Sequence, residues 1–204
     1  MNIAILGAGN IGATLGKHWV RAGHQVCFSV RDLANPELES LLGVLGPAAS
    51  VAAAPEAIAF GEVIVLAVPG GAVEGLVKDN APGLVGKIVI DAANNMRAAS
   101  MNSLAIFTAL APSVIYYRAF NNLGWEVFET PQFGNQPADL LYCGPDGDSQ
   151  ARVEQLIAAI GLRPVRVGGL EQIHLVDMLA QLWFALALGQ GMGRQTAFKV
   201  LRRA

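Results

Sequence analysis

The chain has 204 residues, of which 53% are hydrophobic and 15% are charged, and its formal net charge is −2. This length fits one folding unit with a sizeable core, which argues against a disordered chain. The small net charge provides no basic surface for a run of phosphates, so nucleic acid is not expected as a partner and a small-molecule ligand is.

The apolar runs are short, although the mean hydropathy is +0.42. The longest, residues 182–188, is far below the ~20 residues that span a bilayer. The sequence enters its first apolar run at Ile3 without a basic leader, so we expect a cytoplasmic chain with no membrane segment. Cys27 and Cys143 fall in separate predicted strands and are expected to be buried, reduced thiols without a chemical role.

The first two-thirds of the chain alternates short β-rich runs with helical stretches, a pattern typical of a parallel sheet covered by helices. It predicts strands at residues 2–6, 25–30, 63–68, 87–91, 114–117, 140–143 and 163–167. It also predicts helices, from apolar residues at three- and four-residue spacing, at 11–22, 71–80, 102–111 and 149–160. The Ala-rich stretch 48–59 indicates a short strand followed by a helical turn. The predicted fold class is α/β, a Rossmann-like doubly wound and mostly parallel sheet.

From Glu171 the pattern changes to two predicted helices, 172–188 and 192–203, separated by Gly189-Gln190-Gly191. We expect these helices to form a C-terminal helical cap. The predicted organisation is therefore a Rossmann domain over residues 1–170 and a cap over 171–204, both within the same globular unit.

A Gly-rich turn follows the first predicted strand and opens the first predicted helix, with the sequence Gly7-Ala8-Gly9-Asn10-Ile11-Gly12. In this setting the G-x-G-x-x-G spacing indicates a dinucleotide site. Gly7 allows the tight turn, Gly9 lets a pyrophosphate approach the backbone, and Gly12 lets helix and strand pack closely. The free N–H groups and the positive helix end then face the phosphates.

The end of the second predicted strand reads Ser29-Val30-Arg31, where an NAD-binding chain usually carries an acidic residue. A guanidinium binds a 2′-phosphate in bidentate fashion, and Ser29 adds a hydroxyl donor. We therefore expect NADP(H) as the cofactor. If the strand ends one residue later, Asp32 becomes the ribose acid and Arg31 a surface cation, an alternative that the sequence leaves open.

With these residues placed, the chain resembles the NADPH-dependent reductases of the deazaflavin coenzyme F420. It resembles less closely the cytosolic oxidoreductase domain of the six-transmembrane metalloreductases. Beyond the turn, the likeness rests on Ala67-Val68-Pro69, Asp91-Ala92-Ala93-Asn94-Asn95, Arg118-Ala119-Phe120-Asn121-Asn122-Leu123-Gly124, Leu141-Tyr142-Cys143-Gly144 and residues 182–193.

The resemblance implies that Ala67, Val68 and Pro69 line the adenosine side of the crevice, and that Asn94 approaches the nicotinamide ribose or amide. Pro69 is explained almost as well as a strand terminator, and Asn94 as an ordinary turn residue.

The same likeness makes the segment from Arg118 to Asn122 the substrate edge, with Arg118, Phe120 and Asn121 as contacts. The alternatives are a solvated strand-end charge for Arg118, a core residue for Phe120 and turn chemistry for the asparagines. Asn122 is found where the family often has Thr, and Asn95 where it often has Pro. These departures leave the identity of the electron acceptor open.

The predicted helix 172–188 carries an apolar stripe formed by Leu175, Met178, Leu179, Leu182, Trp183 and Leu186. Such a stripe is usually core or subunit interface, and we favour a homodimer contact. In the alternative, Trp183 is a wall of the substrate crevice and residues 189–193 are a helix hinge.

No nucleophile, base or metal set is evident, and no two of His18, His24 and His174 share a metal-like spacing. Hydride transfer between a nicotinamide and a flavin-like ring is carried by the cofactors themselves. We therefore expect an NADP(H)-dependent oxidoreductase whose small-molecule redox substrate is F420 or a flavin-like acceptor. The alternatives are a non-enzymatic NADPH-sensing module and a flavin or ferric reductase. Imine or 3-hydroxy acid reduction usually requires a longer helical C-terminal domain and an acid such as Lys, neither of which is evident.

Overall fold

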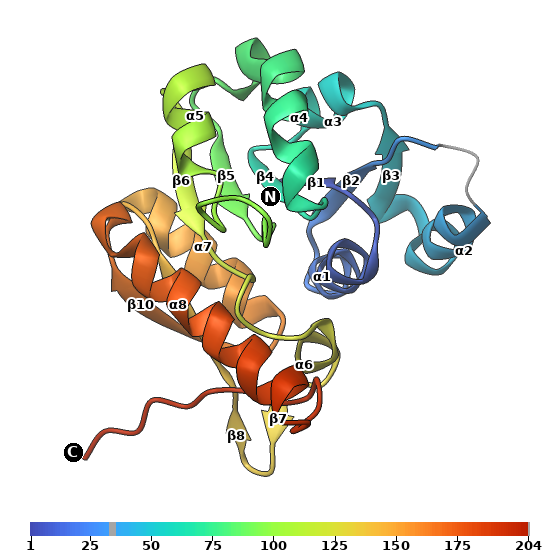
Figure 1. Cartoon of the computed structure of the whole chain (residues 1–204). Coiled ribbons are helices and arrows are strands. Elements are labelled where there is room, and N and C mark those ends of the chain that lie inside the picture. The colour runs from blue at the N-terminus through green and yellow to red at the C-terminus, as the bar shows by residue number, and fades with distance from the viewer. Residues whose placement is uncertain (33–35, 204) are drawn as a thin grey trace. The chain divides into compact units, whose positions relative to one another are not determined.

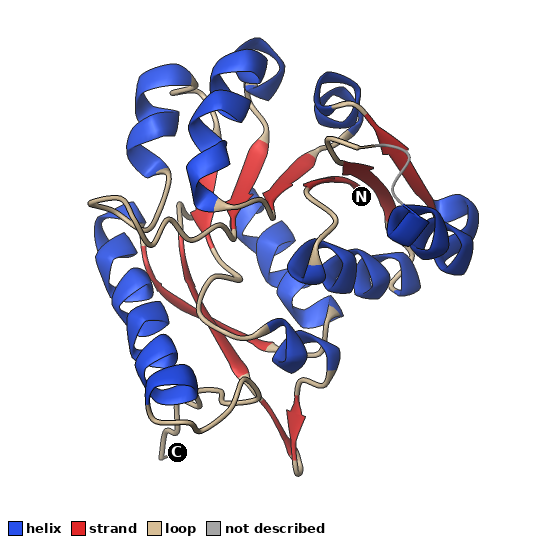
Figure 2. Cartoon of the chain, turned by 45° about the vertical axis from the view of Figure 1, so that its right-hand side comes forward, coloured by secondary structure: helices blue, strands red, loops and turns tan. Residues whose placement is uncertain are grey.

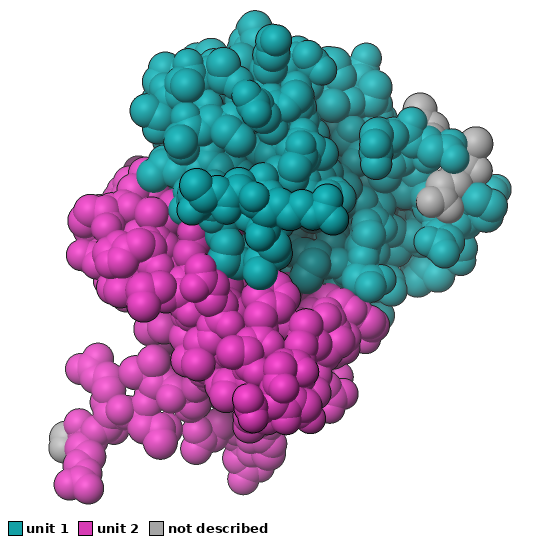
Figure 3. Space-filling view, viewed as in Figure 1, with its two compact units in different colours: residues 1–117 teal, residues 118–204 magenta. Residues whose placement is uncertain are grey.

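The computed structural model describes residues 1–32 and 36–203 (Figure 1). The chain folds into two compact units, Met1–Tyr117 and Arg118–Ala204, which Figure 3 colours separately. They do not coincide with the predicted ranges 1–170 and 171–204. The strand that begins at Asp139 packs with the C-terminal helix, and this contact places residues 118–170 in the same unit as the C-terminal segment.

The first unit is built on strands that run in the order β6-β5-β4-β1-β2-β3, and β1 to β5 pair in parallel. Their bounds are β1 (Asn2–Leu6), β2 (Gln25–Ser29), β3 (Ala49–Ala52), β4 (Val63–Leu66), β5 (Ile88–Asp91) and β6 (Ile115–Arg118). Leu6 at the end of β1 pairs in register with Ser29 of β2 and Leu66 of β4. Because the carboxyl ends are aligned, the loops that follow these strands emerge together at one edge.

The helices of the first unit pack against these strands (Figure 2). They are α1 (Asn10–Arg21), α2 (Pro36–Leu45), α3 (Ala54–Phe60), α4 (Val73–Asn80) and α5 (Leu104–Leu110), with 3-10 turns at Gly46–Ala48, Gly70–Ala72 and Ala81–Leu84. On α1, Leu15 and Trp19 are fully buried. A Cβ at Gly16 would lie 2.3 Å from the Phe28 ring, so this glycine lets α1 pack closely against β2.

The second unit contains a parallel pair, β9 (Asp139–Cys143) and β10 (Arg163–Gly168), connected by α7 (Asp148–Ala159). Cys143 pairs antiparallel with Arg118, which is the last residue of β6 and the first residue of the second unit. The remaining elements are α6 (Trp125–Glu129), the hairpin β7 (Gln132–Phe133) and β8 (Gln136–Pro137), a 3-10 turn at Leu170–Gln172 and α8 (Ile173–Phe184), which continues as a π-helix over Ala185–Gly189. These pairings confirm the predicted Rossmann-like, mostly parallel sheet.

The predicted second helix of the cap, residues 192–203, is wrong. The first cap helix is present as α8 and its π-helical continuation, but residues 190–203 contain no helix. Gly191 and Gly193 adopt positive φ angles of 69° and 88°, which end the helical path. Beyond them the chain is held by side chains of its own unit, since Lys199 pairs with Asp139 at 2.9 Å.

Several elements were not predicted because they are too short to show a periodic pattern of apolar residues. These are α6, with five residues, and the two-residue strands of the β7–β8 hairpin. The helix α2 was also missed. The Ala-rich stretch is confirmed as a strand and a helix, β3 and α3. Cys27 and Cys143 are buried free thiols, as expected.

In the described part of the chain, one helical stretch, Leu170–Gly189, is long and apolar enough to cross a membrane by length and composition alone. This is weak evidence for a span, since core helices of soluble proteins pass the same test.

Candidate functional site

The turn after β1 requires glycine at two positions. Gly7 has a φ of 109°, and a Cβ there would lie 2.4 Å from the carbonyl oxygen of Ala67. A Cβ at Gly12 would lie 2.0 Å from the carbonyl oxygen of Gly7. The Gly7 N–H donates to the carbonyl of Ser29 at 2.8 Å, which ties the turn to the end of β2. Both glycines therefore serve close packing within the protein.

Gly9 differs, because a Cβ there would meet no atom within 4 Å. It is the N-cap of α1, and its carbonyl accepts the Ala13 N–H at 2.8 Å. The N–H groups of the first helical turn have no intrahelical partner, and the helix dipole adds positive potential there. The first turn of α1 carries no acidic side chain to oppose an anion. The space beside Gly9 is therefore open to a phosphate group.

A pocket of about 640 Å³ opens at this edge of the first unit, a size within the usual range for ligand sites. Its lining residues are Gly7, Gly9, Ser29, Val30, Arg31, Ala53, Ala54, Ala67, Val68, Pro69, Ala72, Gly75, Leu76, Asp79 and Asn80. Seven of the residues predicted from the sequence are therefore together here: Gly7, Gly9, Ser29, Arg31, Ala67, Val68 and Pro69. Ala8 and Asn10 line a smaller neighbouring pocket of about 280 Å³ with Gly9.

The end of β2 brings a cation to the pocket. Ser29 is the last residue of β2 and is buried, whereas Arg31 is exposed and lines the pocket. The strand ends one residue earlier than predicted, and Asp32 is not among the lining residues. This geometry favours the interpretation that Arg31 is the group beside the ribose, because a later strand end would be needed to put Asp32 in that place.

One wall of the pocket, formed by α4 and by the start of α3, was not predicted from the sequence. Ala72, Gly75, Leu76, Asp79 and Asn80 belong to the turn and helix after Pro69. Their three- and four-residue spacing within the predicted helix 71–80 was a usable signal. Ala53 and Ala54 reach the pocket because β3 pairs with β2, and the periodicity of apolar residues along the sequence could not indicate this pairing.

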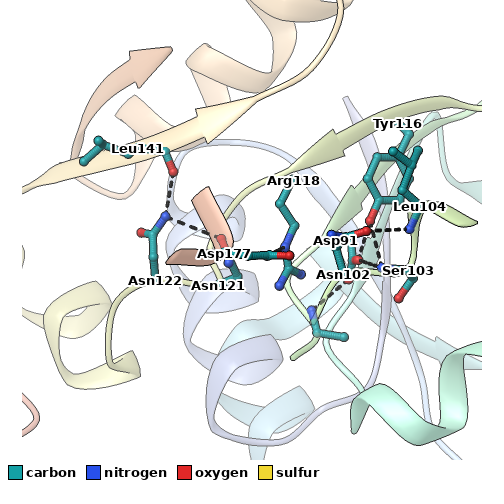
Figure 4. Close-up of polar contacts among 11 residues, drawn as sticks. Asp91, Asn102, Ser103, Leu104, Tyr116, Arg118, Asn121, Asn122, Leu141 and Asp177 are labelled. Carbon is teal, nitrogen blue, oxygen red and sulfur yellow. Dashed lines mark hydrogen bonds and ion pairs between the residues drawn. The ribbon is translucent and has the colours of Figure 1, made fainter. Parts of the chain in front are cut away.

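The loop after β5 is fixed by Asp91, whose carboxylate is buried (Figure 4). It accepts the N–H groups of Ala93 at 3.0 Å and of Ser103 at 2.9 Å, and the hydroxyl of Tyr116 also donates to it. Both ends of the loop are thus tied to one carboxylate. Asn94, which is half-buried, lies inside this loop and is not among the pocket-lining residues.

Gly70 allows the loops after β4 and β5 to touch. A Cβ at Gly70 would lie 2.6 Å from the Cα of Asn95, so only a glycine permits this backbone approach. The loop that carries Val68 and Pro69 and the loop that carries Asn94 therefore pack directly against each other.

Arg118, predicted as a substrate contact or a solvated charge, is fully buried in the second unit. Its Nε donates to Oδ1 of Asp177 on α8 at 2.9 Å (Figure 4). Asp177 is also buried, with 9% of its side chain exposed. The alternative of a solvated strand-end charge is wrong, because the guanidinium is enclosed and paired.

The residues that follow Arg118 are also interior. Phe120 is a non-glycine residue with a positive φ of 62°, and its buried ring makes an edge contact with Phe128 at 5.8 Å between centroids. Asn121 is buried, and the Asn122 amide donates to the Leu141 carbonyl at 2.8 Å. The positive φ at Phe120 is the kind of strain that structures retain at constrained turns.

Trp183 packs inside its own unit. Its side chain is buried, and Nε1 donates to the Thr196 carbonyl at 2.7 Å. The Arg194 guanidinium lies 5.6 Å from the ring centroid and pairs with Glu126. These contacts favour packing over a wall of a substrate crevice.

In the described residues, no group of three or more His, Cys, Asp or Glu side chains is placed to hold a metal ion. Burial, together with the nearby N-terminal amino group, lowers the pKa of His24, and burial raises the pKa of the Cys143 thiol to about 12. The Cys143 thiol is therefore protonated at neutral pH and a poor nucleophile.

Residues 2–95 match the family described as NADP oxidoreductase coenzyme F420-dependent. Over these residues the match agrees with the predicted resemblance and with the predicted enzyme class, NADP-dependent oxidoreductases. It covers the turn after β1, the pocket residues and the first part of the loop after β5, up to Asn95.

Solved structures show the same fold along the chain. One from Arthrobacter sp. FB24, described as a candidate F420-dependent NADP reductase, has 24% identity and a TM-score of 0.85 over 99% of this chain and 100% of that one. A reductive aminase from Aspergillus terreus in complex with NADPH has 21% identity and a TM-score of 0.69, over 91% of this chain and 62% of its own. A pyrroline-5-carboxylate reductase from Coxiella burnetii has 19% identity and a TM-score of 0.69, over 93% and 68%.

Proposed function

Because residues 2–95 match the coenzyme F420-dependent NADP oxidoreductases, we propose that this chain transfers hydride between NADPH and a deazaflavin (F420) or flavin-like acceptor. The pocket of the first unit carries the proposal. It combines an open approach at Gly9, a helix N-terminus and the cation of Arg31 within one cavity. These are the groups that a dinucleotide with a 2′-phosphate requires.

The residues of the pocket fit NADP(H). The pyrophosphate would lie over the N–H groups that follow Gly9, and the 2′-phosphate would be bound by Arg31 and the Ser29 hydroxyl. Val68 and Pro69 would contact the adenosine, and Asn94 would approach the nicotinamide ribose. When bound, the nicotinamide supplies or accepts the hydride, and the chain binds and orients it.

Calorimetric titration with NADPH and NADH tests the cofactor assignment. We expect NADPH to bind about ten- to a hundredfold more tightly, because charged hydrogen bonds to the extra phosphate are worth about 1.5–3 kcal/mol. Arg31→Ala should remove most of this preference. Arg21→Ala is the matched control, since Arg21 is an exposed arginine at the end of α1 outside the pocket lining. Equal affinity for both cofactors in the unmodified protein would contradict the assignment.

The acceptor is tested by stopped-flow oxidation of NADPH with F420, FMN, FAD and ferric chelates. Turnover with F420 or a flavin supports the proposal. Turnover with ferric chelates alone indicates a ferric reductase. Tight NADPH binding without turnover of any acceptor indicates a sensing module.

We also propose that the chain forms a cytoplasmic homodimer through α8. Leu175, Met178 and Leu182 lie at three- and four-residue spacing on this helix, and their exposed fractions are 42%, 58% and 48%. A two-fold axis would pair this apolar face with its own copy. Met178→Glu should shift the chain to the monomer in sedimentation analysis, whereas Gln155→Glu, at an exposed position on α7, should not.

A further inference from the structure

The wall of the pocket formed by α4 has an apolar part and a polar end. Ala72, Gly75 and Leu76 lie in its first part, and Asp79 and Asn80 lie one turn further along. Because residues three and four apart share a helix face, these five residues form one continuous strip.

The apolar part of this strip suits a flat ring. A Cβ at Gly75 would meet no atom within 4 Å, so the space above it is open. Ala72 adds only a methyl group, and Leu76 is half-buried. A planar aromatic ring can therefore lie against the helix between α4 and the loop residues Val68 and Pro69.

The polar end presents hydrogen-bond acceptors. The Asn80 Nδ2 donates to the carbonyl of Leu76 at 2.8 Å. Since a carbonyl can only accept, the amide nitrogen must face it, and Oδ1 is left to accept a hydrogen bond. Asp79, which is exposed, adds a carboxylate, which when ionised only accepts.

The charges of the pocket are also separated. The cation of Arg31 comes from the end of β2, and the carboxylate of Asp79 comes from the end of α4. The adenosine part of NADP(H) has a matching polarity, with an anionic 2′-phosphate on its ribose and a hydrogen-bond donor, the 6-amino group, at the far side of the purine.

We propose that Asp79 and Asn80 recognise the 6-amino group of the cofactor's adenine, and that they make the pocket specific for adenine over 6-oxopurines. The inference rests on the proposed NADP(H) site and assigns the base-reading groups within it. A 6-oxo group is a hydrogen-bond acceptor. It would face the acceptor oxygens of Asp79 and Asn80 with no donor between them, so no hydrogen bond could form.

The test compares NADPH with the reduced nicotinamide hypoxanthine dinucleotide phosphate, in which a 6-oxo group replaces the amine, in titrations followed by nicotinamide fluorescence. We expect the unmodified chain to bind NADPH about tenfold more tightly, equivalent to about 1.4 kcal/mol. In Asp79→Asn the new amide can donate to the 6-oxo group, so the preference should fall to threefold or less. Asn80→Ala should lower it in the same direction.

Glu74→Gln is the matched control, because it neutralises another carboxylate of α4 that is outside the pocket lining. Its preference should stay near tenfold. Thermal unfolding of each variant checks that the first unit remains folded, and Asp79→Asn, on the exposed surface, supplies the result if Asn80→Ala is unstable.

If the unmodified chain binds both dinucleotides equally, or if Asp79→Asn keeps the full preference, the inference is wrong while the NADP(H) site stands. Failure to bind NADPH at all would instead overturn the proposed function.

Discussion

The segments of the first unit that follow β1, β2 and β4 line an open pocket. The segment of the second unit that follows β6 is instead packed with buried side chains. Gly9 and Gly75 have no atom within 4 Å of a Cβ position, and Arg31 is exposed. Arg118 and Phe120 are instead buried within their unit, and Arg118 is paired there. Similar residue types therefore lie in opposite environments. A cation after a strand indicates a ligand site only where its neighbours leave it unenclosed.

The sharpest way to break this comparison is to remove the buried cation. Arg118→Met should lower the free energy of unfolding by about 3–5 kcal/mol, because it removes the guanidinium that pairs with the buried carboxylate of Asp177. Chemical denaturation measures this directly. Adding Asp177→Leu should recover much of the loss, since apolar replacement of a buried pair is often neutral. A stable Arg118→Met chain with impaired acceptor turnover would instead identify Arg118 as a substrate contact.

Gly9→Ala tests whether the space in the first unit is meant for a ligand. The new methyl group meets no protein atom within 4 Å, so thermal stability should be unchanged. NADPH affinity should fall about 100-fold, or about 2.8 kcal/mol, because the methyl group takes the place through which the pyrophosphate approaches. Calorimetry and thermal unfolding give the two readouts.

Gly12→Ala is the contrasting variant. Its Cβ would lie 2.0 Å from the Gly7 carbonyl oxygen, so this change should destabilise the fold itself. Unchanged NADPH affinity in Gly9→Ala would show that the open space is not the pyrophosphate site.

The two regions also differ in how far the sequence predicts them. Gly7, Gly9 and Gly12 could be interpreted because their spacing is local and has a fixed relation to a strand and a helix. Arg118 could not, since its partner Asp177 is 59 residues away and no local pattern links them. Ala53 and Ala54 likewise reach the pocket only through strand pairing. Residues 192–203 were predicted as a helix from the local sequence pattern alone. That pattern contains no information on the contacts that this segment makes with β9.

A carboxylate of the second unit should give a pH signature. Burial acts to raise the pKa of Asp139, but hydrogen bonds from Arg163, the Val200 N–H and Lys199, with the charge of Lys199, outweigh it and lower the pKa from 3.8 to about 2. A lowered folded-state pKa contributes stability that is present above pH 3.8 and is lost as the pH falls toward 2. The contribution is about 2 kcal/mol.

Asp139→Asn should therefore be less stable than the unmodified chain at pH 7, with a difference that narrows between pH 5 and pH 2. Urea denaturation across this range measures it. Asp146→Asn is the control, because the Asp146 carboxylate is 81% exposed in its pair with Arg166 and should change stability by less than about 1 kcal/mol. A difference that does not change with pH would contradict the assignment of Asp139.

The smallest effect is expected for Trp183→Phe, which keeps an aromatic ring and removes one hydrogen-bond donor. Loss of the bond from Nε1 to the Thr196 carbonyl should cost about 1 kcal/mol of stability, measured by denaturation. NADPH affinity and the KM for the acceptor should stay unchanged, because the buried indole is bonded within its own unit. If the KM rises severalfold while stability is unaffected, Trp183 contacts the acceptor, and the second unit, like the first, contributes a ligand surface.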